Sequence, residues 1–255
     1  MVSGARVGAA PTVRYSRRAM HQEHTLDVSV IRAISLDLDD TLWPVWPAIE
    51  RAEAVLHHYL AQHAPATARL FPDPASLRKV RVEVGDEMPH LEHDLSELRR
   101  ESIRRALRHG GDDPALAEAG FDLFFAERQR VDFYADAIGA LERLAARFPL
   151  LALSNGNADI HTVGVGHLFK ARISARDFGR AKPDPSIFHA AAETLGVPAA
   201  SVLHVGDDAA LDVVGALGAG MQAVWVNRKQ MQWSLGRPPQ MEVIELGALC
   251  DVLGC

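Results

Sequence analysis

Short apolar runs that end in polar side chains recur along this 255-residue chain. Residues 30–36, 150–153, 202–205 and 223–226 have the length and composition of buried β-strands. Segments with apolar residues three and four positions apart separate the later runs, which predicts helices between them. The further elements expected in this part are helices at 137–148, 158–169, 185–195 and 209–217, a short strand at 172–174, a loop at 232–239 and a short terminal helix. Strands that alternate with helices indicate an α/β fold with a doubly wound parallel sheet.

The stretch between residues 48 and 130 has a different pattern, which is helical throughout. We expect helices at 48–63, 74–85, 95–109 and 114–130, and no strand among them. The economical interpretation is an all-helical insertion after the first strand. The predicted organisation is a disordered tail at 1–28, a core made of 29–46 and 132–255, and a helical cap at 47–131.

Composition narrows the classes of function. A formal net charge of −6 argues against a general nucleic-acid binder. No apolar run is long enough to span a bilayer, and the arginine-containing tail has no secretory segment. The two cysteines, Cys250 and Cys255, both lie near the C-terminus, so a disulfide between them could not cross-link the core. A reducing, cytoplasmic compartment is therefore expected. The predicted partner is a small molecule, bound by a monomer or homodimer.

Candidate chemistry begins where the first strand ends, at Asp37-Leu38-Asp39. Side chains alternate along a strand, so these two carboxylates project from the same face. Carboxylates held this close repel each other unless a cation lies between them, and Mg²⁺ prefers such oxygen ligands. One carboxylate could then act as a nucleophile while the other transfers a proton. The alternative is an acidic strand end that caps a helix or coats a solvated edge.

Three later segments carry complementary groups. Ser154 lies in a glycine-containing turn whose hydroxyl and N–H groups suit phosphate oxygens. Lys182 precedes two prolines that stiffen the backbone, and its ammonium could neutralise a phosphoryl group. Asp207 can complete a metal site, supported by Asp208 or Asp212. Each segment also has an ordinary structural explanation, such as an N-cap or a surface lysine. The functional interpretation therefore depends on these three segments occurring together with the acidic pair at Asp37 and Asp39.

The four strand ends together resemble the haloacid dehalogenase superfamily of phosphohydrolases. The matching segments, in order, are Asp-x-Asp-x-Thr at 37–41, Ser-Asn at 154–155, Lys-Pro at 182–183 and Gly-Asp-Asp at 206–208. The residues at 154–158, 204–208 and 220–225 are similar to those of a bacterial branch of these phosphatases that acts on flavin mononucleotide and 5-amino-6-(5-phospho-D-ribitylamino)uracil. The resemblance implies a Rossmann-like core with a helical cap after the first motif.

The resemblance also implies a role for each residue of the motifs. Asp37 would attack phosphorus to form an aspartyl-phosphate, and Asp39 would protonate the leaving oxygen. Mg²⁺ would be bound by Asp37, Asp207 and the backbone carbonyl of Asp39, with Asp208 and Asp212 in support. The residues expected to bind the substrate or its phosphate are Thr41, Ser154, Asn155, Gly156, Lys182 and Arg99. Arg99 belongs to a polar cluster in the cap, together with His90, His93, Asp94 and Arg100.

Other functions stay open at this point. Many relatives have Asn-Asp where this chain has Leu211-Asp212, so an amide near the metal is lost. Haloacid dehalogenases resemble this core but lack a carboxylate at the position of Asp39, because a halide needs no proton to leave. A phosphomutase would share all four motifs, and a catalytically silent binding protein could share the scaffold. His204 lies inside a strand and is expected to be a packed core residue.

Overall fold

A six-stranded parallel sheet forms the core of the molecule, in the order β3-β2-β1-β4-β5-β6. The computed structural model describes residues 25–255. The strands are β1 (Ala33–Leu36), β2 (Leu150–Ser154), β3 (Ala171–Ser174), β4 (Val202–Gly206), β5 (Gln222–Val226) and β6 (Met241–Val243). The core helices are α6 (Ala137–Arg147), α7 (Ile160–Val163), α8 (Ala175–Phe178), α9 (Pro185–Leu195), α10 (Gly215–Gly218) and α11 (Leu246–Leu253). The predicted doubly wound α/β fold is confirmed.

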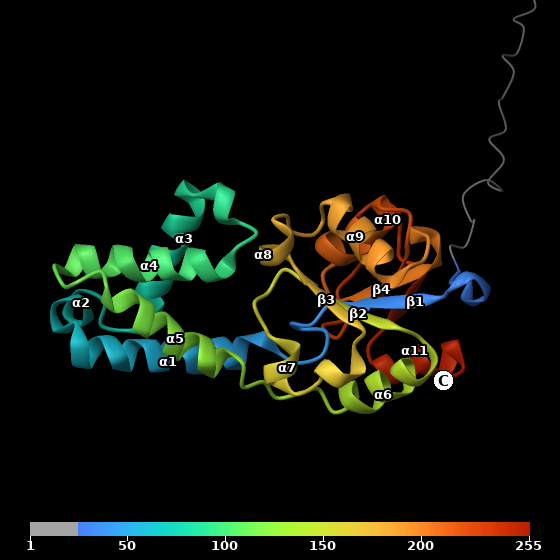
Figure 1. Cartoon of the computed structure of the whole chain (residues 1–255), viewed down its shortest axis with the longest axis horizontal. Coiled ribbons are helices and arrows are strands. Elements are labelled where there is room, and N and C mark those ends of the chain that lie inside the picture. The colour runs from blue at the N-terminus through green and yellow to red at the C-terminus, as the bar shows by residue number, and fades with distance from the viewer. Residues whose placement is uncertain (1–24) are drawn as a thin grey trace, which may run out of the picture.

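Helices cover both faces of this sheet, as Figure 1 shows. Ile34 and Leu36 of β1 pack with α6 and α11 in one apolar cluster. Ala33, from the same strand, packs with α9 in the cluster on the other face. Successive residues of a strand face opposite sides, so burial on both sides explains why β1 is apolar at every position except Ser35.

The helical insertion forms a second body beside the sheet (Figure 1). Its helices are α1 (Val45–His63), α2 (Pro65–Leu70), α3 (Pro74–Glu87), α4 (Leu95–Gly110) and α5 (Leu116–Arg128). Leu56, Leu107 and Phe121, from three of these helices, meet in an apolar cluster of their own. Helices α1, α4 and α5 therefore each bury one apolar stripe against their neighbours, which is what the three- and four-residue spacing predicted.

Several predicted boundaries were wrong. β1 begins at Ala33, because Val28–Val30 form a short 3₁₀ helix instead of extending the strand. The helix expected at 158–169 is reduced to α7 and a 3₁₀ turn, since Gly164 adopts the left-handed conformation that ends a helix. The helix expected at 209–217 is π-helical over Ala209–Val214. The helices α2 and α8 and the strand β6 were missed because all three are short.

The expected disordered tail at 1–28 falls largely outside the described residues, which begin at 25. Its last part is ordered: the backbone N–H of Asp27 donates to Oε1 of Gln222 at 2.8 Å. Among residues 25–255, none of the helices combines the length and apolar character that a bilayer crossing requires.

Candidate active site

The predicted site residues meet at the carboxyl edge of the sheet, where β1, β2 and β4 end side by side. Leu36 is in register with Ala152 on one side and Val205 on the other. The next residues along these strands therefore emerge at one place, beyond the carboxyl ends of the strands, where ligands bind in open α/β sheets. A cavity of about 390 Å³ lies there between the core and the cap, and its lining includes Asp37, Ser154 and Asp207.

The ammonium of Lys182 is the most highly paired group in this site. Its Nζ donates to Oδ1 of Asp37 at 2.6 Å, to Oδ1 of Asp212 at 2.6 Å and to the carbonyl oxygen of Leu153 at 2.9 Å. Lys182 is 3 % exposed, so the alternative of a surface lysine in a proline-rich loop is wrong. Burial lowers the pKa of Lys182, but the two carboxylates outweigh it and hold the pKa well above its ordinary value.

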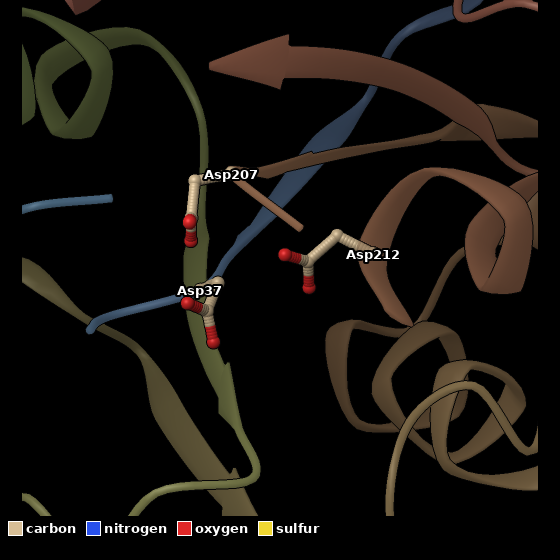
Figure 2. Close-up of side chains that lie close together, drawn as sticks. All are labelled: Asp37, Asp207 and Asp212. Atoms are coloured by element: carbon tan, nitrogen blue, oxygen red, sulfur yellow. The ribbon is translucent and has the colours of Figure 1, made fainter. Parts of the chain in front are cut away.

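Three carboxylates converge beside this ammonium: those of Asp37, Asp207 and Asp212. One oxygen from each lies within 4.8 Å of the others, and Figure 2 shows the three side chains lying close together. Burial raises the pKa of Asp37 despite the opposing effect of Lys182, and the two other carboxylates raise it further. Burial and repulsion from Asp212 raise the pKa of Asp207 to about 7.

These observations fit a bound divalent cation. Three carboxylates against one ammonium leave an excess of negative charge in a largely buried space, which a cation would neutralise. The donors are all oxygens, and oxygen donors suit Mg²⁺ rather than Zn²⁺. The structure supplies Asp37 and Asp207, as the sequence predicted, and adds Asp212 to the group.

Asp212 and Asp208 have different surroundings, which the sequence could not distinguish. Asp212 is 1 % exposed and accepts hydrogen bonds from Lys182 Nζ and from the Asp208 backbone N–H at 2.9 Å. Asp208 instead caps the following helical segment, accepting from the N–H groups of Ala210 and Leu211 at 2.8 Å each. Support for the buried site therefore comes from the carboxylate of Asp212.

His204 is fully buried, as predicted, and it also holds Asp212. Its Nε2 lies 3.1 Å from Oδ1 of Asp212, and its Nδ1 lies 2.8 Å from the Ser35 hydroxyl. Burial lowers the pKa of His204, which keeps the ring neutral at pH 7. An ionised carboxylate can only accept, so we assign the proton to Nε2 and the Ser35 hydroxyl as donor to Nδ1.

The carboxylate of Asp39 points toward the cap. Nη2 of Arg128 donates to its Oδ1 at 2.7 Å and to its Oδ2 at 2.6 Å, and Nε1 of Trp43 donates to Oδ1 at 2.8 Å. A Cβ at Gly156 would collide with Oδ2 of Asp39, so only glycine fits beside it. Sequence reasoning missed Arg128, because a contact between residues 89 positions apart leaves no local signal in the sequence.

The remaining residues that were predicted to bind phosphate differ in the groups to which they are hydrogen-bonded. The Ser154 hydroxyl accepts from the Gly156 N–H at 3.0 Å and lines the cavity. Both polar atoms of the Asn155 side chain are bonded to the backbone of Lys182, at 2.9 Å and 2.8 Å, so this amide positions the lysine loop. The Thr41 hydroxyl donates to Oδ1 of Asp207 at 3.2 Å.

The cap residues named from the sequence separate into two groups. Arg99 lines the cavity, where its guanidinium lies over the ring of Phe124 at 4.3 Å. Arg100 pairs with Glu97 and Glu118 and lies outside the lining, as do His90 and His93, while Asp94 caps α4. Trp43 is fully buried in the apolar cluster of the core, where it packs edge-on against Phe133.

Comparison with known proteins assigns the family. The model of the haloacid dehalogenase-like hydrolases matches residues 31–220. The chain belongs to the haloacid dehalogenase-like hydrolase family. It is therefore a hydrolase, and the resemblance inferred from its four motifs is confirmed.

Individual relatives refine this comparison. The 5-amino-6-(5-phospho-D-ribitylamino)uracil phosphatase YigB of Escherichia coli is 36% identical over 88% of this chain and 96% of its own. The mouse N-acylneuraminate-9-phosphatase is 29% identical over 90% of this chain and 98% of its own. A crystal structure described as a 2-haloacid dehalogenase from Pseudomonas syringae is 38% identical, with a TM-score of 0.81, over 88% of this chain and 98% of its own.

The contrast between Asp212 and Asp208 gives a testable prediction about stability. Asp212→Ala should lower the free energy of unfolding by about 3–5 kcal/mol, because it leaves the buried Lys182 without one carboxylate. Asp208→Ala, the neighbouring control, should cost about 1 kcal/mol, the usual value of an N-cap. Urea unfolding of both variants measures these losses. Equal losses would contradict the assignment of Asp212 as the buried support.

Proposed function

We propose that this protein is a Mg²⁺-dependent phosphomonoester hydrolase that acts through an aspartyl-phosphate on a small phosphorylated metabolite. The observation that carries the proposal is the arrangement around Asp37, whose carboxylate is held by Lys182 and lies in a cavity beside Asp39. A positioned carboxylate next to a second, independently held carboxylate suits nucleophilic attack combined with proton transfer.

In the proposed first step, a carboxylate oxygen of Asp37 attacks phosphorus and the bond to the leaving oxygen breaks. Asp39 gives its proton to that oxygen. In the second step Asp39 takes a proton from a water molecule, which attacks the aspartyl-phosphate and releases inorganic phosphate. Arg128 and Trp43 would keep the Asp39 carboxylate in position for both transfers, because they contact it directly.

The phosphoryl oxygens need donors and positive charge. We assign these to the Ser154 hydroxyl, the Lys182 ammonium and the backbone N–H groups of the turn at Asn155 and Gly156, which line the cavity. Asp37 and Asp207, with the Asp39 backbone carbonyl, would hold Mg²⁺, and Asp212 would support Lys182 beside it. When bound, the metal supplies positive charge that stabilises the negative charge on the transferring group.

Flavin mononucleotide and 5-amino-6-(5-phospho-D-ribitylamino)uracil are the first substrates to test, given the similarity to the Escherichia coli phosphatase. A haloacid dehalogenase is the second candidate, since a structure so described is 38% identical. Asp39 favours the phosphatase, because an alkoxide leaving group needs a proton and a halide does not. Phosphate release and halide release, measured on a phosphate-ester panel and on 2-chloropropionate, decide between the two.

Replacing the nucleophile should abolish turnover. Asp37→Asn is expected to lower kcat on p-nitrophenyl phosphate by about four orders of magnitude or more, because an amide cannot act as the attacking oxyanion. Asp86→Asn is the matched control, since it makes the same exchange at an exposed position of α3. A folded Asp37→Asn protein with near-wild-type kcat would overturn the mechanism.

Replacing the proton donor should matter more for poor leaving groups. Asp39→Asn is expected to lower kcat/KM on ribitol 5-phosphate by about 10²–10⁴-fold, the usual contribution of general acid–base catalysis. The loss on p-nitrophenyl phosphate should be smaller, because its leaving group needs little protonation. Steady-state kinetics on both substrates test this, and equal losses would remove Asp39 from the acid role.

Removal of the metal should abolish activity, and Mg²⁺ should restore it. Mg²⁺ should also raise the melting temperature of the chelated protein, because a ligand at a hundredfold over its Kd stabilises by about 2.7 kcal/mol. Asp207→Asn should abolish this rise, whereas Asp86→Asn should keep it. Full activity in excess EDTA, or an unchanged thermal response in Asp207→Asn, would contradict the assigned site.

A further inference from the structure

The cavity between cap and core has opposite charge at its two ends. The core end carries the carboxylates of Asp37, Asp39, Asp40, Asp207, Asp208 and Asp212. The cap end carries the guanidinium groups of Arg78, Arg81 and Arg99, on α3 and α4, with the single carboxylate of Glu53 from α1. The cap end therefore has an excess of positive charge in a partly enclosed space.

Glu53 is already shared between two of these arginines. Its Oε2 accepts from Nη2 of Arg78 at 2.7 Å, and its Oε1 accepts from Nη2 of Arg99 at 3.3 Å. Glu53 and Arg99 are both buried, at 3% and 6% exposure. This carboxylate therefore holds two of the three guanidinium groups of the cap end.

Arg81 is the third guanidinium, and it is left without a partner. Within residues 25–255 it makes no ion pair, and its Nε is a buried donor with no hydrogen bond. Burial lowers the pKa of Arg81. Burial and the charge of Arg81 also lower the pKa of Arg99 to about 10. A buried donor is costly unless an acceptor lies within hydrogen-bond distance of it.

We propose that Arg81, with Arg99 beside it, binds hydrogen-bond-accepting oxygens at the end of the substrate remote from the phosphoryl group. This inference rests on the proposed phosphatase activity and specifies the substrate class. A guanidinium presents a planar fork of donors, which matches two oxygens on a planar group. Two kinds of group present such acceptors: a carboxylate, whose two oxygens match the fork together, and a dioxopyrimidine ring, whose carbonyl oxygens each accept from one donor. Ile49 and Leu95, also in the lining, supply apolar walls for the chain between the two ends.

A series of five-carbon phosphate esters tests the inference. Ribitol 5-phosphate is the parent, 5-phosphoribonate adds a terminal carboxylate, and flavin mononucleotide adds a dioxopyrimidine ring to the same ribityl phosphate. The wild type should prefer at least one of the two acceptor-bearing esters by about ten- to a hundredfold in kcat/KM, the range for a hydrogen bond to a charged group. The preferred ester identifies the source of the oxygens.

Arg81→Gln should remove this preference, with the change mainly in KM, because the contact is equally available in ground and transition states. Lys79→Gln is the matched control, since it removes one positive charge from an exposed position of the same helix outside the cavity lining. It should leave the preference intact. Thermal melting verifies that both variants fold.

Three results would overturn the inference: no preference in the wild type, an unchanged preference in Arg81→Gln, or an equal loss on all three esters. The last would mean that the arginines only attract phosphate in general. Hydrolysis of phenyl phosphate separates this failure from that of the proposed function, because it needs no distal acceptor. Calorimetric titration of the three esters into Asp37→Asn, with and without Arg81→Gln, measures the same preference without turnover.

Discussion

The buried ammonium of Lys182 is the interaction on which the arrangement of the site depends. It joins the end of β1, through Asp37, to the π-helical segment after β4, through Asp212. A charge this deeply buried is stable only when it is paired, so both carboxylates must keep their positions. Asn155 holds the backbone of the lysine from the end of β2. One cation thus links three strand ends, while His204 holds Asp212 from inside the sheet.

The cap contributes to the site through charges as well as through shape. Arg128, at the end of α5, contacts the carboxylate of Asp39, which follows β1 in the core. This contact ties the position of the cap to the group that we propose transfers protons. Farther from the sheet, the arginines of α3 and α4 give the cavity a positive end. The core therefore places carboxylates around the reacting centre, and the cap supplies the hydrogen-bond donors of its arginines.

Similarity to proteins described as phosphatases and as a dehalogenase shows that one scaffold hosts different chemistry. In this chain the fold places the carboxylate of Asp37 directly after β1. What separates the two reactions is the need of the leaving group for a proton. Asp39 is a second carboxylate, two residues after Asp37, and Arg128 and Trp43 hold it in place. Its presence in this chain bears on which of the two reactions the site suits.

The sequence by itself determined the α/β class, the helical insertion and the convergence of Asp37, Ser154, Lys182 and Asp207, because parallel strands bring their ends to one edge and apolar periodicity is local. It could not determine which of two neighbouring acids, Asp208 or Asp212, turns inward, since that depends on the π-helical turn between them. Nor could it find the contact of Arg128 with Asp39 or the unpartnered Arg81. Those depend on how the cap helices pack and where the cap lies against the sheet, and residues 89 positions apart carry no local signal of meeting.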